Sequence, residues 1–268
     1  MVLTTATHLV NNIAALDRKT TGCDRIGLHE ASFKKPHSRA MGCRELVAIN
    51  GSLENWPQLV RGVRPGVETL ILDPNCDGVA QITAILRQAA ANDRYTTLHL
   101  VSHGEPGSLK LGNGILSRET LSGYESDLQL WQKFLGQENS FGSEILIYGC
   151  SFAAQETSRN FVRVLGKLTG AKIAASRSLV GCAARGGHWN LDFRTGEIAT
   201  DVAFGKELQQ TYTGILATFT VNSTDDTVDV NPGDGIAEDD AGNIALRAYV
   251  RTLHESRIYT ISNRLIFF

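Results

Sequence analysis

Short apolar runs alternate along this chain with longer stretches in which apolar residues recur at helical spacing. The short runs cover residues 46–49, 67–72, 97–101, 144–148 and 172–175. Each of them ends at turn-forming or polar residues, which is typical of strands buried on both faces of a parallel sheet. The helical stripes cover residues 55–63, 78–91, 118–135 and 155–168. This alternation predicts right-handed βαβ units and an α/β fold with a doubly wound, mostly parallel sheet and helices on both faces.

Two hairpins are predicted beside this alternation. The first is punctuated by glycines and lies within residues 107–117, after the third strand and the Ser-His-Gly sequence over 102–104. The second pairs residues 188–193 with the chain from Glu197 onward, across the turn formed by residues 194–196.

Composition divides the chain of 268 residues into five parts. Residues 1–43 show no sustained period and are predicted to be a disordered leader. The α/β domain is expected over 44–204, with a connecting segment over 205–217. Residues 218–250 are rich in Asp, Asn and Gly and predict a small β-rich segment. The tail, 251–268, ends in apolar residues, and we interpret it as truncated or divergent.

Charge and segment type narrow the function classes. Lys and Arg total 26 against 28 for Asp and Glu, so the chain lacks the basic excess of nucleic-acid-binding proteins. No run of eighteen apolar residues is present, and the N-terminus lacks the pattern of a Sec signal peptide. The five cysteines lie singly, without the spacing of a zinc site. We therefore expect no nucleic-acid partner, no membrane span, no metal and no cofactor.

Two chemically reactive residues follow consecutive strands. His103 and Gly104 come directly after the third predicted strand, and Gly149 and Cys150 come directly after the fourth. The carboxyl ends of neighbouring parallel strands lie about 5 Å apart, where ligands and catalytic groups collect. A nearby imidazole can take the thiol proton, and a thiolate attacks carbonyl groups. The backbone N–H groups of Gly104 and Cys150 would then face the oxyanion, with Gly104 and Gly149 allowing close approach.

The same residues also have a purely structural interpretation. A single cysteine at a strand end is often a small buried apolar residue, and a Ser-His-Gly turn can be a satisfied loop. Cys182 is expected at the same end of the sheet as Cys150, and an oxidised pair would block catalysis. His99, inside the third strand, is most simply a core or sheet-face histidine.

Two acidic segments are candidate calcium sites. Residues 73–78 match the first half of a calcium-binding loop, but Ala84 stands where a bidentate Glu is needed. A strand-to-helix turn with Asp77 near the helix start is the better interpretation. The acidic residues within 225–240 indicate solvated turns more than a calcium site.

Three segments carry a resemblance to a known family. They are LVSHGEPGSLKLGNGILS, EILIYGCSFAAQETSRNFVRVLGKLTGAKIAAS and GGHWNLDF, and the resemblance spans about residues 45–200. They resemble the bacterial domain-of-unknown-function family 4347 (DUF4347). Family members commonly lie near the front of very large cell-surface or secreted proteins, ahead of cadherin-like, Calx-beta or calcium-binding repeats. The His-Gly and Gly-Cys motifs also resemble the caspase-like clan of cysteine peptidases.

This resemblance implies that His103 is a general base and Cys150 a nucleophile. Caspases place Gln-Ala-Cys at the nucleophile, whereas this chain has Tyr-Gly-Cys over 148–150, so caspase substrate preference does not transfer. Residues 176–178 are Ser-Arg-Ser where an acidic residue is expected, which leaves Asp192 as a distant candidate.

The segment over 219–248 resembles a CSLREA-type domain. Ala237 and Ile244 stand in this segment where that motif has two cysteines.

Two functions follow as hypotheses. The first is a caspase-like cysteine peptidase or self-processing domain near the front of a bacterial surface or secreted protein, acting on a peptide or on its own downstream chain. The alternative is a non-catalytic adhesion or export module with the same fold.

Overall fold

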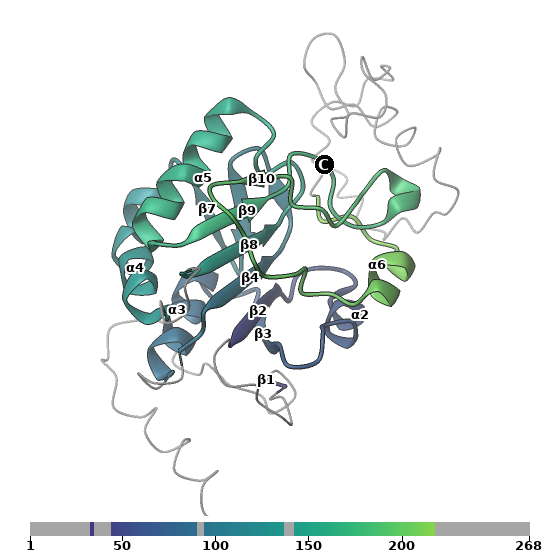
Figure 1. Cartoon of the computed structure of the whole chain (residues 1–268), viewed down its shortest axis with the longest axis horizontal. Helices are drawn as coiled ribbons and strands as arrows, with labels where there is room; N and C mark the ends of the chain where they lie inside the picture. Colours follow the sequence, from purple (N-terminus) through teal and green to yellow (C-terminus); the bar gives the residue numbers. More distant parts are fainter. Residues whose placement is uncertain (1–32, 35–43, 90–93, 137–141, 218–268) are drawn as a thin grey trace, which may run out of the picture.

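A single sheet organises the part of the chain that the structure describes. The computed structural model describes residues 33–34, 44–89, 94–136 and 142–217 (Figure 1). Within these ranges, a seven-stranded sheet has the order β1-β3-β2-β4-β8-β9-β10. The five central strands are parallel: β2 (Glu45–Asn50), β3 (Glu68–Leu72), β4 (Thr97–Val101), β8 (Glu144–Tyr148) and β9 (Lys172–Ala175). The edge strands β1 (Phe33–Lys34) and β10 (Phe193–Arg194) are antiparallel to their neighbours.

Helices cover both faces of the sheet, unequally. One face is covered by α3 (Gly78–Gln88), α4 (Leu121–Phe134) and α5 (Glu156–Thr169). The other face carries the short helices α2 (Trp56–Arg61) and α6 (Lys206–Thr211), together with irregular segments (Figure 1). The short 3-10 helix η2 covers Ala183–Arg185. The mixed α/β class with a mostly parallel sheet is therefore confirmed.

The alternation of side chains along each strand explains how one apolar run contributes to the cores on both faces of the sheet. In β2, Leu46 and Ala48 belong to the core beneath α3, α4 and α5, whereas Val47 and Ile49 belong to the core on the opposite face. Successive side chains of a strand point to opposite faces, so a strand buried on both sides must be apolar throughout. All four side chains are fully buried.

The glycine-punctuated hairpin after β4 is a small antiparallel sheet. It consists of β5 (Gly104–Glu105), β6 (Ser108–Leu111) and β7 (Gly114–Ser117). Leu109 and Leu111 alternate with exposed Lys110 and anchor this sheet in the larger core. It begins at Gly104, so it fixes the chain directly after His103.

The second predicted hairpin is wrong. Residues 188–193 do not pair with the chain after Glu197; Phe193 and Arg194 instead form β10 against β9. His188 bridges Val180, and Trp189 packs edge-on against Phe204 at 4.9 Å between ring centroids. The alternation of apolar residues that suggested a hairpin therefore comes from packing on the sheet's second face.

Residues 205–217, expected as a connecting segment, contribute α6 and part of the second core. Leu208, Tyr212 and Leu216 are buried there. The leader expected over 1–43, apart from β1, and the segments expected over 218–250 and 251–268 lie outside the described residues.

The turn considered as a calcium loop is a helix cap. The Asp77 carboxylate accepts a hydrogen bond from the Ala80 N–H at 2.8 Å and one from the Tyr124 hydroxyl at 2.6 Å. A carboxylate in this place satisfies a free N–H group of the first helical turn. The favoured interpretation of Asp77 as a residue at the helix start is confirmed. In the described ranges, no three His, Cys, Asp or Glu side chains are grouped so as to hold a metal ion.

No helix among the described residues combines the length and the apolar character needed to cross a membrane.

Candidate active site

The loops after β4 and β8 touch through two glycines. Strands β4 and β8 are neighbours in register, with Val101 opposite Tyr148. A Cβ atom on Gly104 would lie 2.6 Å from the Gly149 Cα and 2.9 Å from the Cys150 nitrogen. Such distances exclude any side chain at position 104, so the backbones that follow His103 and precede Cys150 are in direct contact. The topology thus brings the two predicted loops together, while their catalytic roles stay a prediction.

Two backbone N–H groups in this contact converge on one oxygen atom. The N–H of Gly104 donates to the Leu216 carbonyl at 3.0 Å, and the N–H of Cys150 donates to the same carbonyl at 3.1 Å. Two donors fixed on one carbonyl oxygen are the arrangement that stabilises an oxyanion in acyl transfer. The sequence predicted these two donors, but it gave no indication of the acceptor.

The segment that supplies this acceptor is paired along its backbone with residues 180–182. Leu216 N–H donates to the Val180 carbonyl at 2.9 Å, and Cys182 N–H donates to the Gly214 carbonyl at 2.9 Å. Ile215 lies opposite Gly181 in an antiparallel bridge. Residues 214–216 therefore add a short extended strand to the loop after β9.

The Cys150 side chain is fully enclosed. It is 1% exposed, its Sγ accepts a hydrogen bond from the Val180 N–H at 3.1 Å, and Sγ lies 3.6 Å from the Val180 carbonyl oxygen. Burial raises the pKa of this thiol to about 12, although hydrogen bonds with the backbone of Val180 and Leu216 act in the opposite direction. The thiol is therefore protonated at neutral pH in this arrangement.

His103 contacts the same segment at Ala217. Burial lowers the pKa of its imidazole, the charge of Lys110 lowers it further, and a hydrogen bond with the backbone of Ala217 acts in the opposite direction. Its Nδ1 is buried and has no hydrogen-bond partner among the described residues. Among the hydrogen bonds of the described residues, none joins His103 directly to Cys150. The pair therefore consists of a neutral imidazole and a neutral thiol.

The turn after Cys150 is conformationally unusual. Ser151 has a φ of 54°, the left-handed region that non-glycine residues rarely adopt. Its N–H donates to the Ser178 carbonyl at 2.9 Å, and the N–H of Ala153 donates to the Ser176 carbonyl at 2.9 Å. These bonds to the loop after β9 hold the strained turn and fix the direction in which Cys150 leaves the sheet.

Two further residues named from the sequence are Asp192 and Cys182. Asp192, the distant candidate for a substrate-binding acid, accepts hydrogen bonds from the Arg177 backbone at 2.9 Å and guanidinium at 2.8 Å. Its charge is thus already compensated, and its pKa is lowered by these contacts although burial opposes them. Cys150 and Cys182 are both free thiols, so the disulfide considered between them is absent.

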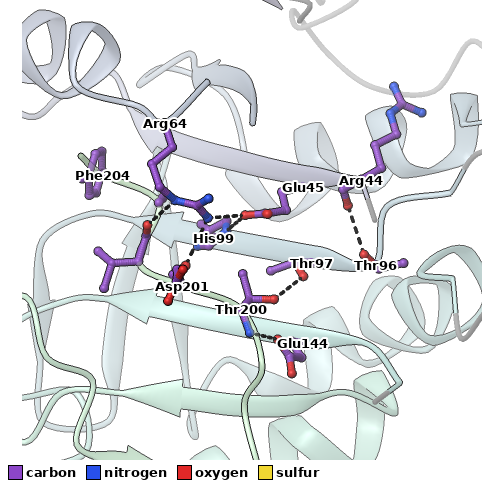
Figure 2. Close-up of polar contacts among 12 residues, drawn as sticks. Arg44, Glu45, Arg64, Thr96, Thr97, His99, Glu144, Thr200, Asp201 and Phe204 are labelled. Carbon is purple, nitrogen blue, oxygen red and sulfur yellow. Dashed lines mark hydrogen bonds and ion pairs between the residues drawn. The ribbon is translucent and has the colours of Figure 1, made fainter. Parts of the chain in front are cut away.

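A polar network lies on the sheet's second face, where Figure 2 shows Arg64, Glu45 and His99 together. Glu45 Oε2 lies 2.8 Å from the Arg64 guanidinium and 3.0 Å from His99 Nε2. His99 Nδ1 lies 3.1 Å from the Tyr148 hydroxyl, which accepts a hydrogen bond from the Ala203 N–H at 3.0 Å. The Tyr148 O–H is therefore free to donate to His99, whose second nitrogen can donate to Glu45.

This network holds residues 199–204, which we call the strap, across the sheet. The Arg64 side chain donates to the Val202 carbonyl at 2.6 Å. The buried Glu144 carboxylate accepts hydrogen bonds from the Ala199 and Thr200 N–H groups at 2.7 and 3.0 Å (Figure 2). The strap leads directly into α6 and from there to residues 214–217. His99 is confirmed as a sheet-face histidine, and its contacts position this part of the chain.

The backbone pairing of residues 180–182 with 214–216 was not predicted from the sequence. These residues act through backbone groups, which leave no signature in side-chain chemistry. Gly181 and Gly214 are the only traces: a Cβ on Gly181 would lie 2.4 Å from the Gly214 carbonyl oxygen, and Gly181 has a φ of 129°. Glycines in a loop are too common to identify such a contact without the structure.

A comparison with protein-family models gives one match, over residues 46–216. The matching model is described as a domain of unknown function (DUF4347). Among curated proteins, no sequence matches the chain.

Proposed function

We propose that this chain is a cysteine peptidase with Cys150 as nucleophile and His103 as general base. The chain belongs to the family of domains of unknown function DUF4347. The observation that carries the proposal is the convergence of the Gly104 and Cys150 N–H groups on one carbonyl oxygen. A caspase-like peptidase needs such a pair of donors beside its thiol.

The proposed reaction uses groups that lie on the two strand ends. Cys150 Sγ attacks a peptide carbonyl carbon while His103 takes the thiol proton, and the N–H groups of Gly104 and Cys150 bind the resulting oxyanion. His103 returns the proton to the leaving amine as the carbon–nitrogen bond breaks, leaving a thioester on Cys150. Water then attacks the thioester with His103 as base, which releases a carboxylate and restores the thiol.

The raised pKa of Cys150 and the lowered pKa of His103 fit a particular order of proton movement. Both groups are neutral at pH 7, so no thiolate stands ready before substrate attack. Proton transfer to His103 then accompanies formation of the sulfur–carbon bond.

The enclosed thiol favours a second candidate function. A Cys150 that is 1% exposed and bonded to Val180 is also what a non-catalytic adhesion or export module would contain. Under both hypotheses we propose, from the family resemblance alone, that the domain belongs to a bacterial surface or secreted protein.

Labelling of the full chain with a leucine acyloxymethyl ketone, located by mass spectrometry, tests the peptidase proposal. We expect the adduct on Cys150 in the wild type and in Cys182→Ala, which removes the only other free thiol among the described residues. Cys150→Ala should give no adduct. His103→Gln, which keeps a polar side chain but removes the base, should slow labelling at least about 100-fold.

Other results would favour the non-catalytic module. They are an adduct on Cys182 in place of Cys150, or equal rates of Cys150 labelling in the wild type and His103→Gln.

A further inference from the structure

The segment that ends at Ala217 is bound in the manner of a peptide ligand. Leu216 N–H and the Gly214 carbonyl both pair with the loop after β9, and Ile215 lies antiparallel to Gly181. Addition of an extended strand to a free backbone edge is a common way in which proteins recognise peptides, because main-chain hydrogen bonds give affinity for many sequences.

The peptide bond between Leu216 and Ala217 contacts the backbone of both candidate catalytic loops. Its carbonyl oxygen accepts the N–H groups of Gly104 and Cys150 at 3.0 and 3.1 Å. The hydrogen bond between His103 and the Ala217 backbone raises the imidazole pKa, as donation to a carbonyl oxygen does, so it involves the residue on the leaving side of that bond. Ala217 also lies opposite Gly104 in a parallel bridge. The nucleophile's own N–H group thus binds the acyl side of this peptide, and the base contacts the residue that follows it.

The residue on the acyl side fills an apolar site. Leu216 is 0% exposed and belongs to the core cluster that also contains Cys150, Val180 and Tyr212. A side chain of this kind gains about 1.5–3 kcal/mol from complete burial. The apolar residues around Leu216 therefore suit a leucine side chain.

The preceding elements deliver this segment to the site from within the same chain. The strap is pinned by Arg64, Glu144 and Tyr148, and α6 follows it directly. The match to the family model ends at residue 216.

From these contacts we infer that the chain is its own substrate and that Cys150 cuts the Leu216–Ala217 bond intramolecularly. The inference rests on the proposed peptidase function and names the substrate of that site. Sγ adds to the Leu216 carbonyl carbon, the thiol proton passes through His103 to the Ala217 nitrogen, and the peptide bond breaks. Water hydrolyses the Leu216 thioester, which leaves a carboxylate at Leu216, an amine at Ala217 and a free Cys150 thiol.

The test is incubation of the purified full chain, followed by intact-mass analysis and N-terminal sequencing of the products. We expect two fragments, one ending at Leu216 and one beginning at Ala217, formed at a rate independent of protein concentration. Cys150→Ala should remain intact.

A second pair of variants tests the bond itself. Ala217→Pro places a ring where His103 must deliver a proton, and its extended preceding residue is one that proline tolerates. This variant should remain intact while retaining the probe adduct on Cys150. Ala217→Gly, the matched control, should be cut at the same bond.

The possible failures are distinguishable. Cleavage at another bond that still requires Cys150, or an intact wild-type chain whose Cys150 takes the ketone probe, would overturn the inference and leave the peptidase proposal standing. An intact chain without any Cys150 adduct would overturn both.

Discussion

At the scale of single residues, the site depends on two glycines. Gly104 and Gly149 have no Cβ, and this lets two loops approach until their backbone atoms touch. The approach aims two N–H groups at one point. Backbone donors held in this way need no reorganisation when charge develops on the bound oxygen, which is why such sites are effective in acyl transfer.

Gly104→Ala should therefore damage the site through space alone. Its Cβ would lie 2.6 Å from the Gly149 Cα, so the loops must separate and the two N–H groups lose their common target. We expect Cys150 labelling by the ketone probe to fall about 100-fold or more, as after loss of one oxyanion donor. The unfolding free energy, measured in urea, should fall by about 1–3 kcal/mol from overpacking.

Gly123→Ala is the matched control for this prediction. A Cβ on Gly123, an exposed residue of α4, meets no atom within 4 Å, so the helix should become slightly more stable and labelling should not change. Equal labelling rates in the two variants would contradict the role assigned to the glycine contact.

At the scale of elements, the strap is held by side chains that belong to the sheet. The Tyr148 hydroxyl binds Ala203 and His99, so a strand residue at the core links the strap to the polar network. Backbone contacts with the loop after α2 add to these bonds: the Arg64 N–H donates to the Ala203 carbonyl at 2.8 Å, and Val63 and Phe204 form an antiparallel bridge. The position of the strap depends on these contacts and on the buried polar groups, each costly to leave unpaired.

Tyr148→Phe should loosen the strap while the apolar packing stays nearly intact. It leaves the buried Ala203 N–H without its acceptor, and we expect a loss of about 1–3 kcal/mol in unfolding free energy. Hydrogen exchange should accelerate most at the amides of residues 199–204.

Tyr124→Phe provides the comparison, because the Tyr124 hydroxyl bonds Asp77 on the other face of the sheet. This variant should leave exchange in the strap unchanged. Similar acceleration in both variants would show that Tyr148 does not hold the strap specifically.

The elements divide into those that periodicity predicts and those that it cannot. Strands such as β4 and helices such as α5 can be predicted from apolar runs and helical stripes, because the residues that they bury lie a few positions apart in the sequence. β10 and the segment over 214–217 are positioned by partners distant in the sequence. The reactive residues His103 and Cys150 could be found from strand ends, whereas a carbonyl such as that of Leu216 is present at every position.

At the scale of the whole molecule, the second face of the sheet contains ionisable groups within its core. Burial lowers the pKa of His99, while its contacts with Glu45 act in the opposite direction. The unfolded chain takes up a proton at His99 near pH 6.5, which the folded chain does not. The contribution of neutral His99 to the unfolding free energy is therefore complete above pH 6.5. It is lost as the pH falls toward the pKa of His99 in the folded chain.

We accordingly expect the unfolding free energy to decrease between pH 6.5 and pH 4.5. The pKa of Glu45 is also lowered, from 4.5, so its contribution is lost only at more acidic pH. Urea titrations across this window should give a shallower pH dependence for His99→Gln than for the wild type. His103→Gln should also give a shallower pH dependence, because burial lowers the pKa of His103 as well. Identical slopes in all three proteins would contradict this assignment.

The Leu216 carbonyl accepts hydrogen bonds from the Gly104 and Cys150 N–H groups, so any ligand from solution must compete with it for this site. A tethered group competes at an effective concentration on the order of millimolar. For a segment whose own dissociation constant as a free peptide is about 1 μM, any inhibitor of the site would thus appear roughly 1,000-fold weaker while the segment is bound. Screening the intact chain would therefore select compounds for their ability to displace a strand, and the affinity of the emptied site would be measurable only after that strand had left.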